Sequence, residues 1–156
     1  MKLWDRDDLV SWRKALKEEG LRLVFTNGCF DVLHVGHIRL LEEAALLGDR
    51  LLVALNSDES VRRLKGPRRP LTVLEERAEI LAAVRFVDRV VAFGEDTPYE
   101  LIELVRPDVL VKGGDWSLEK VVGRSIVEAN GGSVSIVPLV AGRSSSRLIE
   151  EIPTSS

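Results

Sequence analysis

Short apolar runs alternate with amphipathic segments along almost the whole chain. The apolar runs have the length of buried strands and predict strands at residues 21–25, 50–56, 86–93, 109–112 and 133–138. Between these runs, apolar residues recur every three or four positions, which is the period of a helix. These segments predict helices at residues 7–16, 38–47, 57–64, 72–83, 97–106, 118–130 and 144–152. The pattern therefore predicts strands and helices in alternation.

This alternation is typical of an α/β fold in which right-handed crossovers join parallel strands. We therefore expect a single Rossmann-like domain with a five-stranded, doubly wound parallel sheet in the order 3-2-1-4-5 and helices on both faces. An N-terminal helix within residues 1–20 is expected to pack on the domain, which spans residues 21–152. Residues 153–156 are expected to form a loose tail.

The composition narrows the class of protein. The chain has 156 residues, 45% of them hydrophobic and 30% charged, which is ordinary for a soluble globular domain. The net charge of -3 gives no bulk attraction to nucleic acid or to an anionic membrane, so neither partner is expected. Cys29 is the only cysteine, and residues 1–8 are charged rather than apolar. We therefore expect a cytoplasmic protein without a disulfide or a signal peptide.

The segment with the clearest chemistry is residues 26–37, which joins the first predicted strand to the helix after it. His34 and His37 are three positions apart and therefore share one face of that helix. Gly36 leaves the backbone N–H groups of the helix N-terminus open, and such groups suit a phosphate. The segment therefore predicts transfer chemistry on a phosphate. Two alternatives stay open: a metal triad of Asp31, His34 and His37, and a purely structural histidine pair.

Three further loops lie at carboxyl ends of strands or at helix starts, and a doubly wound sheet brings these edges to one crevice. One is a basic loop within residues 62–70, which suits phosphate neutralisation, although a charge run is often only a solvated face. Another, residues 112–116, permits close backbone approach to a ligand or forms a simple turn. The third, residues 142–146, offers serine hydroxyls at a helix start, either for an anion or for a cap alone. Within residues 26–37, Cys29 is interpreted as a packing residue rather than a nucleophile.

The string Gly28-x-Phe30-Asp31-x-x-His34-x-Gly36-His37 resembles the signature of the cytidylyltransferase-like nucleotidyltransferase superfamily. Beyond this signature, the chain is similar to the adenylyltransferases that activate D-glycero-β-D-manno-heptose 1-phosphate, here as a stand-alone form of a domain that is often fused to a kinase. The segments that carry this likeness are residues 56–58, 63–66, 69–70, 75–77, 95–98, 107–115 and 130–132.

This resemblance implies a reaction in which ATP and a sugar 1-phosphate give ADP-sugar and pyrophosphate. It implies a catalytic role for His34, His37 and Lys65, and contacts from Arg69 and Arg77 to substrate phosphate. The residues implied in nucleotide binding are Thr26, Asn27, Gly28, Cys29, Phe30, Gly36, Lys112, Gly114, Asp115, Ser144, Ser145 and Ser146. It also implies Mg²⁺, held mainly by phosphates rather than by side chains, and a homodimer.

Two alternative functions remain open at this point. One is a glycerol-3-phosphate cytidylyltransferase or another nucleotidyltransferase for a small phosphorylated acceptor. The other is a catalytically silent module that binds a nucleotide for regulation, which would release no pyrophosphate. A dinucleotide-binding dehydrogenase is disfavoured, because residues 28–30 do not begin a Gly-x-Gly-x-x-Gly fingerprint. For the dimer, the apolar residues of the predicted third strand, 86–93, are candidate contacts.

Overall fold

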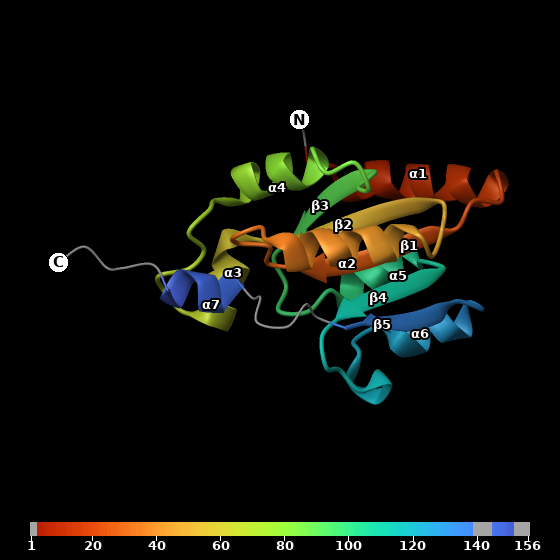
Figure 1. The fold of residues 1–156 in the computed structure, drawn as a ribbon. Helices are drawn as coiled ribbons and strands as arrows, with labels where there is room; N and C mark the ends of the chain where they lie inside the picture. The colour runs from red at the N-terminus through yellow and green to blue at the C-terminus, as the bar shows by residue number, and fades with distance from the viewer. Residues whose placement is uncertain (1–2, 139–144, 152–156) are drawn as a thin grey trace.

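Five parallel strands form a single sheet in the order β3-β2-β1-β4-β5 in the computed structural model, which describes residues 3–138 and 145–151 (Figure 1). The strands are β1 (Leu23–Gly28), β2 (Arg50–Asn56), β3 (Arg89–Phe93), β4 (Val109–Gly113) and β5 (Ser133–Val137). The predicted fold class and strand order are confirmed. The order places the topological switch point between β1 and β4, where this kind of sheet opens a crevice at its carboxyl edge.

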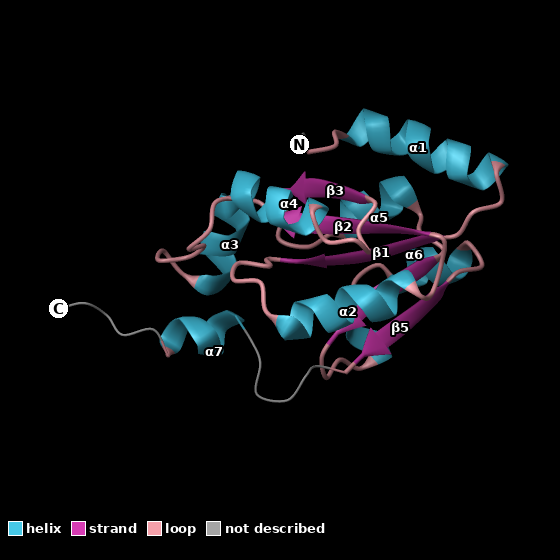
Figure 2. Cartoon of the chain, turned by 45° about the horizontal axis from the view of Figure 1, so that its top comes forward, coloured by secondary structure: helices cyan, strands magenta, loops and turns pink. Residues whose placement is uncertain are grey.

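Helices cover both faces of the sheet (Figure 2). They are α1 (Arg6–Glu18), α2 (Val35–Ala45), α3 (Asp58–Lys65), α4 (Leu74–Ala82), α5 (Tyr99–Val105), the short 3₁₀ helix η1 (Leu118–Lys120), α6 (Arg124–Ala129) and α7 (Ser145–Glu150). Side chains of α2 and α4 belong to the core on one face, and those of α1, α5 and α6 to the core on the other. Within the described residues, no helix has the length and apolar character needed to cross a bilayer.

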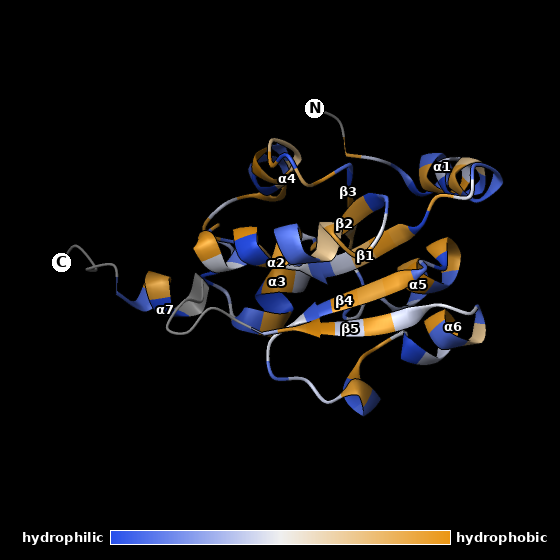
Figure 3. Ribbon diagram, turned by 45° about the vertical axis from the view of Figure 1, so that its right-hand side comes forward, coloured by the Kyte–Doolittle hydropathy of each residue, from blue (hydrophilic) through white to orange (hydrophobic). Residues whose placement is uncertain are grey.

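The strands are mainly apolar; in Figure 3, β4 is orange up to its hydrophilic carboxyl end, and β5 alternates orange with white at its serines. Successive residues of one strand enter opposite cores: Val24 packs on the α2 and α4 side, whereas Phe25 packs on the α1, α5 and α6 side. Both side chains are fully buried. A parallel sheet that is covered on both faces needs mainly apolar strands, and for this reason the apolar runs predicted strands correctly.

The third strand is shorter than predicted, because residues 84–87 form a turn in which the Val87 N–H donates to the Val84 carbonyl at 3.0 Å. Phe86 and Val87 pack on the core beside α4. Val90 and Val91 are each only 1% exposed. Val90 and Val91 are thus covered within the chain, whereas Phe86 and Val87 are only partly buried, and the dimer contact stays a prediction.

The predicted helix 118–130 is broken into η1 and α6. Gly123 lies between them with φ of 86°, a left-handed conformation that favours glycine. A Cβ atom at Gly123 would lie 2.7 Å from Cδ1 of Ile102, so the close approach of α5 also requires glycine. As a result, η1 stands away from α6 at the carboxyl edge of the sheet.

Candidate active site

The loop after β1 turns sharply into α2 and positions both histidines. Phe30 adopts a left-handed conformation with φ of 48°, and its ring is buried in the core on the α2 side. A Cβ atom at Gly28 would lie 3.0 Å from this ring, so Gly28 allows the ring to fold back over the end of the strand. The turn therefore brings the first residues of α2 directly beside the strand end.

His34 and His37 cap α2 reciprocally. The Gly36 N–H donates to Nδ1 of His34 at 3.0 Å, and the His34 N–H donates to Nδ1 of His37 at 3.2 Å. The two rings are stacked with centroids 3.9 Å apart, and the Phe30 ring lies 5.0 Å from that of His37. This is the arrangement of a capping box, with imidazole nitrogens in place of the usual oxygens.

These hydrogen bonds assign the protonation of both rings. Each Nδ1 accepts a backbone N–H, so each neutral imidazole carries its proton on Nε2. Both residues are half-buried, and the Nε2 atom of His34 is itself buried. Burial, together with the neighbouring charges of His34 and Lys65, lowers the pKa of His37 to about 4. At neutral pH, His37 is therefore a neutral hydrogen-bond donor through Nε2, not a proton shuttle.

Lys65 and Cys29 lie on either side of the strand end. Lys65 is the exposed last residue of α3, and its charge affects the pKa of both His37 and Cys29. Burial raises the pKa of the Cys29 thiol, and the positive charge of Lys65 only partly offsets this effect. The thiol contacts Oδ1 of Asn56 at 3.8 Å. Cys29 is thus a neutral thiol, in keeping with the packing interpretation.

Asp31 anchors the basic loop to the signature segment. Its side chain is 0% exposed. It accepts hydrogen bonds from Nε of Arg69 at 2.7 Å and from the N–H groups of Leu71 at 2.8 Å and Thr72 at 3.0 Å. Burial alone would raise the pKa of Asp31, but these hydrogen bonds and the charge of Arg69 outweigh it and lower the pKa. Nη2 of Arg69 is buried and has no hydrogen-bond partner among the described residues.

With its carboxylate engaged in this way, Asp31 is not arranged as a metal ligand beside the histidines. Over residues 3–138 and 145–151, no group of three or more His, Cys, Asp or Glu side chains is placed to hold a metal ion. The metal-triad alternative therefore has no support from the geometry.

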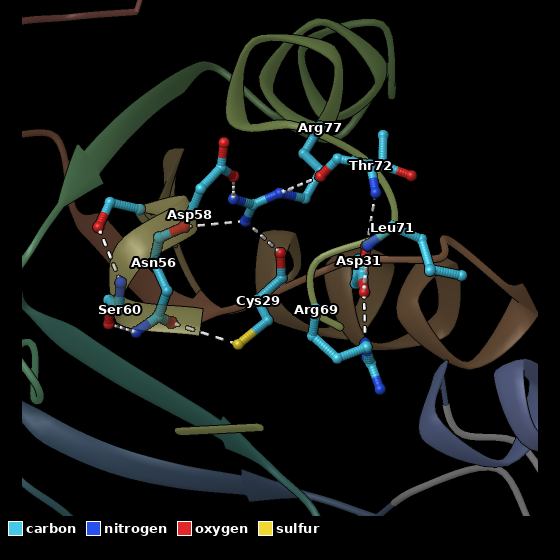
Figure 4. Close-up of polar contacts among 10 residues, drawn as sticks. Cys29, Asp31, Asn56, Asp58, Ser60, Arg69, Leu71, Thr72 and Arg77 are labelled. Atoms are coloured by element: carbon cyan, nitrogen blue, oxygen red, sulfur yellow. Dashed lines mark hydrogen bonds and ion pairs between the residues drawn. The ribbon is translucent and has the colours of Figure 1, made fainter. Parts of the chain in front are cut away.

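Arg77 is buried rather than open to a phosphate, being 1% exposed (Figure 4). Its guanidinium donates to oxygen atoms of Thr72 (2.9 Å), Cys29 (2.7 Å), Asn56 (2.9 Å) and Asp58 (2.7 Å). These atoms belong to the turn before α4, the signature segment, the end of β2 and the start of α3. The expectation of a phosphate contact is therefore revised: Arg77 holds four segments of the site together.

Thr26 also has a structural role in place of the expected nucleotide contact. It is 1% exposed, and its Oγ1 donates to the Val111 carbonyl at 3.0 Å across the switch point. Gly114 is buried with φ of 111°, and its N–H donates to the Val137 carbonyl at 2.9 Å, whereas Asp115 is exposed. Ser144 lies outside the described residues. Ser145 and Ser146 begin α7, and only their backbone is described.

A pocket of about 480 Å³ opens at the carboxyl edge of the sheet. Residues expected from the sequence supply part of its wall, namely Asn27, Gly28, Cys29, Lys65 and Lys112. Asn56 and Trp116 complete the predicted part of the wall, Asn56 as a polar group suited to acceptor hydroxyls and Trp116 in the predicted loop 112–116. The remaining wall residues were not predicted as site residues; they are Leu64, Asp96, Thr97, Pro98, Leu110, Lys120, Val121 and Val122. The loop after β3, which carries Asp96 and Thr97, follows a strand end like the other site loops, and this signal was available in the sequence.

Lys112 lines this pocket. It is half-buried, and its ammonium group lies 4.7 Å from the centre of the Trp116 ring. Burial lowers the pKa of Lys112, and the interaction with Cys29 only partly offsets this lowering. Among the described residues, Lys112 forms no ion pair with a carboxylate. A half-buried ammonium group without a counter-charge suits an anionic ligand.

Comparison with known proteins gives concordant matches. The chain is 56% identical over 155 residues to the bifunctional protein HldE of Geotalea uraniireducens, covering 99% of this chain and 32% of that protein. It is 60% identical over 136 residues to the bifunctional protein HldE of Citrifermentans bemidjiense, covering 87% of this chain and 28% of that protein. The chain thus spans only about a third of the length of these relatives.

A similar solved structure is the crystal structure of the lipopolysaccharide core biosynthesis protein from Thermoplasma volcanium. It matches with a TM-score of 0.63 and 30% sequence identity, covering 78% of this chain and 98% of that one. A sequence model of the cytidylyltransferase-like family matches residues 25–140, which include the signature loop, the capped histidines and every wall of the pocket. This chain therefore belongs to the cytidylyltransferase-like family.

Proposed function

We propose that the protein is an adenylyltransferase that joins ATP to D-glycero-β-D-manno-heptose 1-phosphate, giving ADP-heptose and pyrophosphate. The observation that carries nucleotidyl transfer is the histidine pair, whose Nδ1 atoms are both bonded to backbone at the start of α2. This leaves the Nε2–H of His37, backbone N–H groups and the helix dipole as the groups that can face a phosphate. Support for the heptose acceptor comes from the matching motifs between residues 56 and 132 and from the similarity to the two HldE proteins.

The proposed reaction is a displacement at the α-phosphorus of ATP. An oxygen of the acceptor's phosphate forms the new bond to phosphorus, and the bond to the pyrophosphate oxygen breaks on the opposite side. His37 donates a hydrogen bond to the α-phosphate, His34 holds the start of α2 in place beside it, and Lys65 neutralises the charge that builds there. The protein forms no covalent intermediate, so its contribution is positioning and electrostatic stabilisation.

Two further phosphate contacts are part of this proposal. The buried Nη2 of Arg69, which has no partner among the described residues, is suited to a substrate phosphate oxygen. The serines at residues 144–146 stay predicted contacts of the β- and γ-phosphates. Mg²⁺ is proposed to enter bound to ATP, held by phosphate oxygens as part of the substrate.

The proposed homodimer and the cytoplasmic location rest on weaker support. The dimer is implied by family resemblance alone, and light scattering at micromolar concentration would test it. The cytoplasm is the compartment that supplies ATP to such a reaction, and the single cysteine fits a reducing environment.

The decisive experiment measures pyrophosphate release for each pair of nucleotide and acceptor. We expect turnover with ATP and the heptose 1-phosphate, and poor turnover with CTP or with glycerol 3-phosphate. Turnover confined to CTP and glycerol 3-phosphate would support the cytidylyltransferase alternative. Binding of ATP without pyrophosphate release from any pair would support a silent module.

A further inference from the structure

The histidines and the pocket lie on opposite faces of the sheet. His34 and His37 begin α2, whose side chains pack in the core shared with α4. The pocket instead contains Leu110 and Val121, which belong to the core shared with α1, α5 and α6. The end of β1, at Gly28 and Cys29, separates the two regions and lines the pocket. The site therefore has two sides that meet at one strand end.

In-line displacement requires two such sides. The attacking oxygen and the leaving pyrophosphate must lie on opposite sides of the α-phosphorus. With the triphosphate held at the start of α2, the pocket on the other face of the sheet gives the acceptor a separate approach to the α-phosphorus. We propose that the pocket is the acceptor's sugar subsite and that Asp96 is its specificity-determining residue, an inference that rests on the proposed function.

The charges of the pocket favour a phosphorylated sugar over a purine. Lys65, Lys112 and Lys120 all contribute to its wall. Lys65 is assigned to the α-phosphate, but a purine would leave Lys112 and Lys120 without an anion, whereas the phosphate of a sugar 1-phosphate supplies one. Trp116 is 46% exposed and offers a flat apolar surface for the face of a sugar ring. This assigns Lys112 to the acceptor instead of the nucleotide.

Asp96 is held in the pocket wall by Arg63, a residue of α3. Nε of Arg63 donates to Oδ1 of Asp96 at 2.9 Å, and Nη2 of Arg63 donates to the Gly94 carbonyl. Arg63 thus fixes the loop between β3 and α5 through two contacts, one at each end of residues 94–96. The Asp96 side chain is 71% exposed, so its second oxygen is accessible to acceptor hydroxyls. A carboxylate accepts hydrogen bonds from neighbouring sugar hydroxyls, which glycerol 3-phosphate cannot present in a ring.

The test compares Asp96→Asn with Glu103→Gln, a control at an exposed position of α5 outside the pocket. Asparagine keeps an oxygen that can accept from Arg63, but it removes the negative charge of the carboxylate that accepts from the sugar hydroxyls. We expect Asp96→Asn to lower kcat/KM for the heptose 1-phosphate by about 10- to 100-fold, the usual cost of a hydrogen bond to a charged group. Calorimetry should give an unchanged Kd for ATP, and Glu103→Gln should match the wild type in both measurements.

Two results would overturn the assignment. Equal weakening of ATP and acceptor by Asp96→Asn would place the nucleoside in the pocket, and unchanged acceptor kinetics would remove Asp96 from the subsite. A second measurement separates this inference from the proposed reaction. The indole N–H resonance of Trp116, identified with Trp116→Phe, should shift when the heptose 1-phosphate is added alone and stay in place with ATP alone.

The two proposals can then fail independently. If the wild type releases no pyrophosphate but the Trp116 resonance responds to the sugar phosphate, the proposed reaction fails and the subsite stands. If turnover occurs while this resonance responds to ATP and not to the sugar phosphate, the reaction stands and the subsite is wrong.

Discussion

At the scale of single residues, the histidine pair has a structural role in addition to the chemical role proposed for it. The spacing of His34 and His37 predicted a shared helical face at a phosphate site. Sequence spacing alone did not indicate that the same rings cap the helix through Nδ1. This second role changes what a substitution should do, because removing a ring also removes a backbone hydrogen bond.

We expect His37→Ala to reduce turnover about a hundredfold, as with other preorganised electrostatic groups. It should also lower Tm by about 2–4 °C, because the helix loses a cap worth about 1 kcal/mol. Steady-state kinetics and thermal unfolding measure the two effects. Asp5→Ala is the control, since Asp5 caps α1 by accepting the Asp8 N–H at 2.8 Å. It should lower Tm similarly and leave turnover unchanged; full activity of His37→Ala would exclude the catalytic role.

The lowered pKa of His37 predicts a pH dependence of stability. The folded pKa of about 4 is below the ordinary value of 6.5, so the unfolded chain takes up this proton first. The contribution is complete above about pH 6.5 and is lost as the pH falls toward about 4. The loss of Tm between pH 7 and pH 5 should therefore be greater for the wild type than for His37→Asn. Imidazole NMR should give a midpoint near 4 for His37 in the free protein, and a midpoint near 6.5 would contradict the buried, neutral ring.

At the scale of elements, the candidate site is assembled by charged side chains that are buried and bonded to other parts of the chain. Arg77 joins four segments, and Asp31 joins the signature segment to the basic loop. In the sequence, a buried arginine bonded to carbonyls is indistinguishable from one that binds phosphate. Its burial depends on where β2 and α4 meet, which is a tertiary property. Asp96 differs, because its loop follows a strand end and could have been predicted as part of the site from the sequence.

Arg77→Lys should test this assembling role. Lysine can keep the ion pair to Asp58 but cannot reach four oxygen atoms in a fork, so stability should fall by roughly 2–4 kcal/mol. Urea unfolding would measure the loss, and KM for both substrates should rise together because every wall of the site is loosened. Arg62→Lys, at an exposed position of α3, should change neither quantity. A rise in KM for one substrate at unchanged stability would instead indicate direct phosphate binding.

At the scale of the whole molecule, the alternation of strands and helices was enough to predict the fold. Apolar runs that are buried on both faces leave few other arrangements. The N-terminal helix was also expected to pack on the domain, although α1 lies outside residues 25–140 matched by the family. Leu9 of α1 is 0% exposed in the same core as α5 and α6. Arg13 adds hydrogen bonds to the Val105 and Arg106 carbonyls at 3.1 and 2.9 Å.

Leu9→Ala should therefore destabilise the whole molecule by about 2–5 kcal/mol, because it opens a cavity in this core. Urea unfolding should remain a single transition at lower urea concentration, with KM for ATP unchanged. The neighbouring Val10 is 44% exposed, and Val10→Ala should have almost no effect. If α1 were only an appendage, Leu9→Ala would leave the main transition where it is.

The reciprocal cap of α2 also determines how the site reacts with electrophiles. Reagents that acylate histidine attack the lone pair of a neutral imidazole. In His34 and His37, the only two histidines of the chain, that lone pair is on Nδ1 and is already bonded to a backbone N–H. Both rings should therefore be slow to acylate even though they serve an open site. Inactivation by such a reagent would report how often the first turn of α2 opens, not how accessible the substrate pocket is.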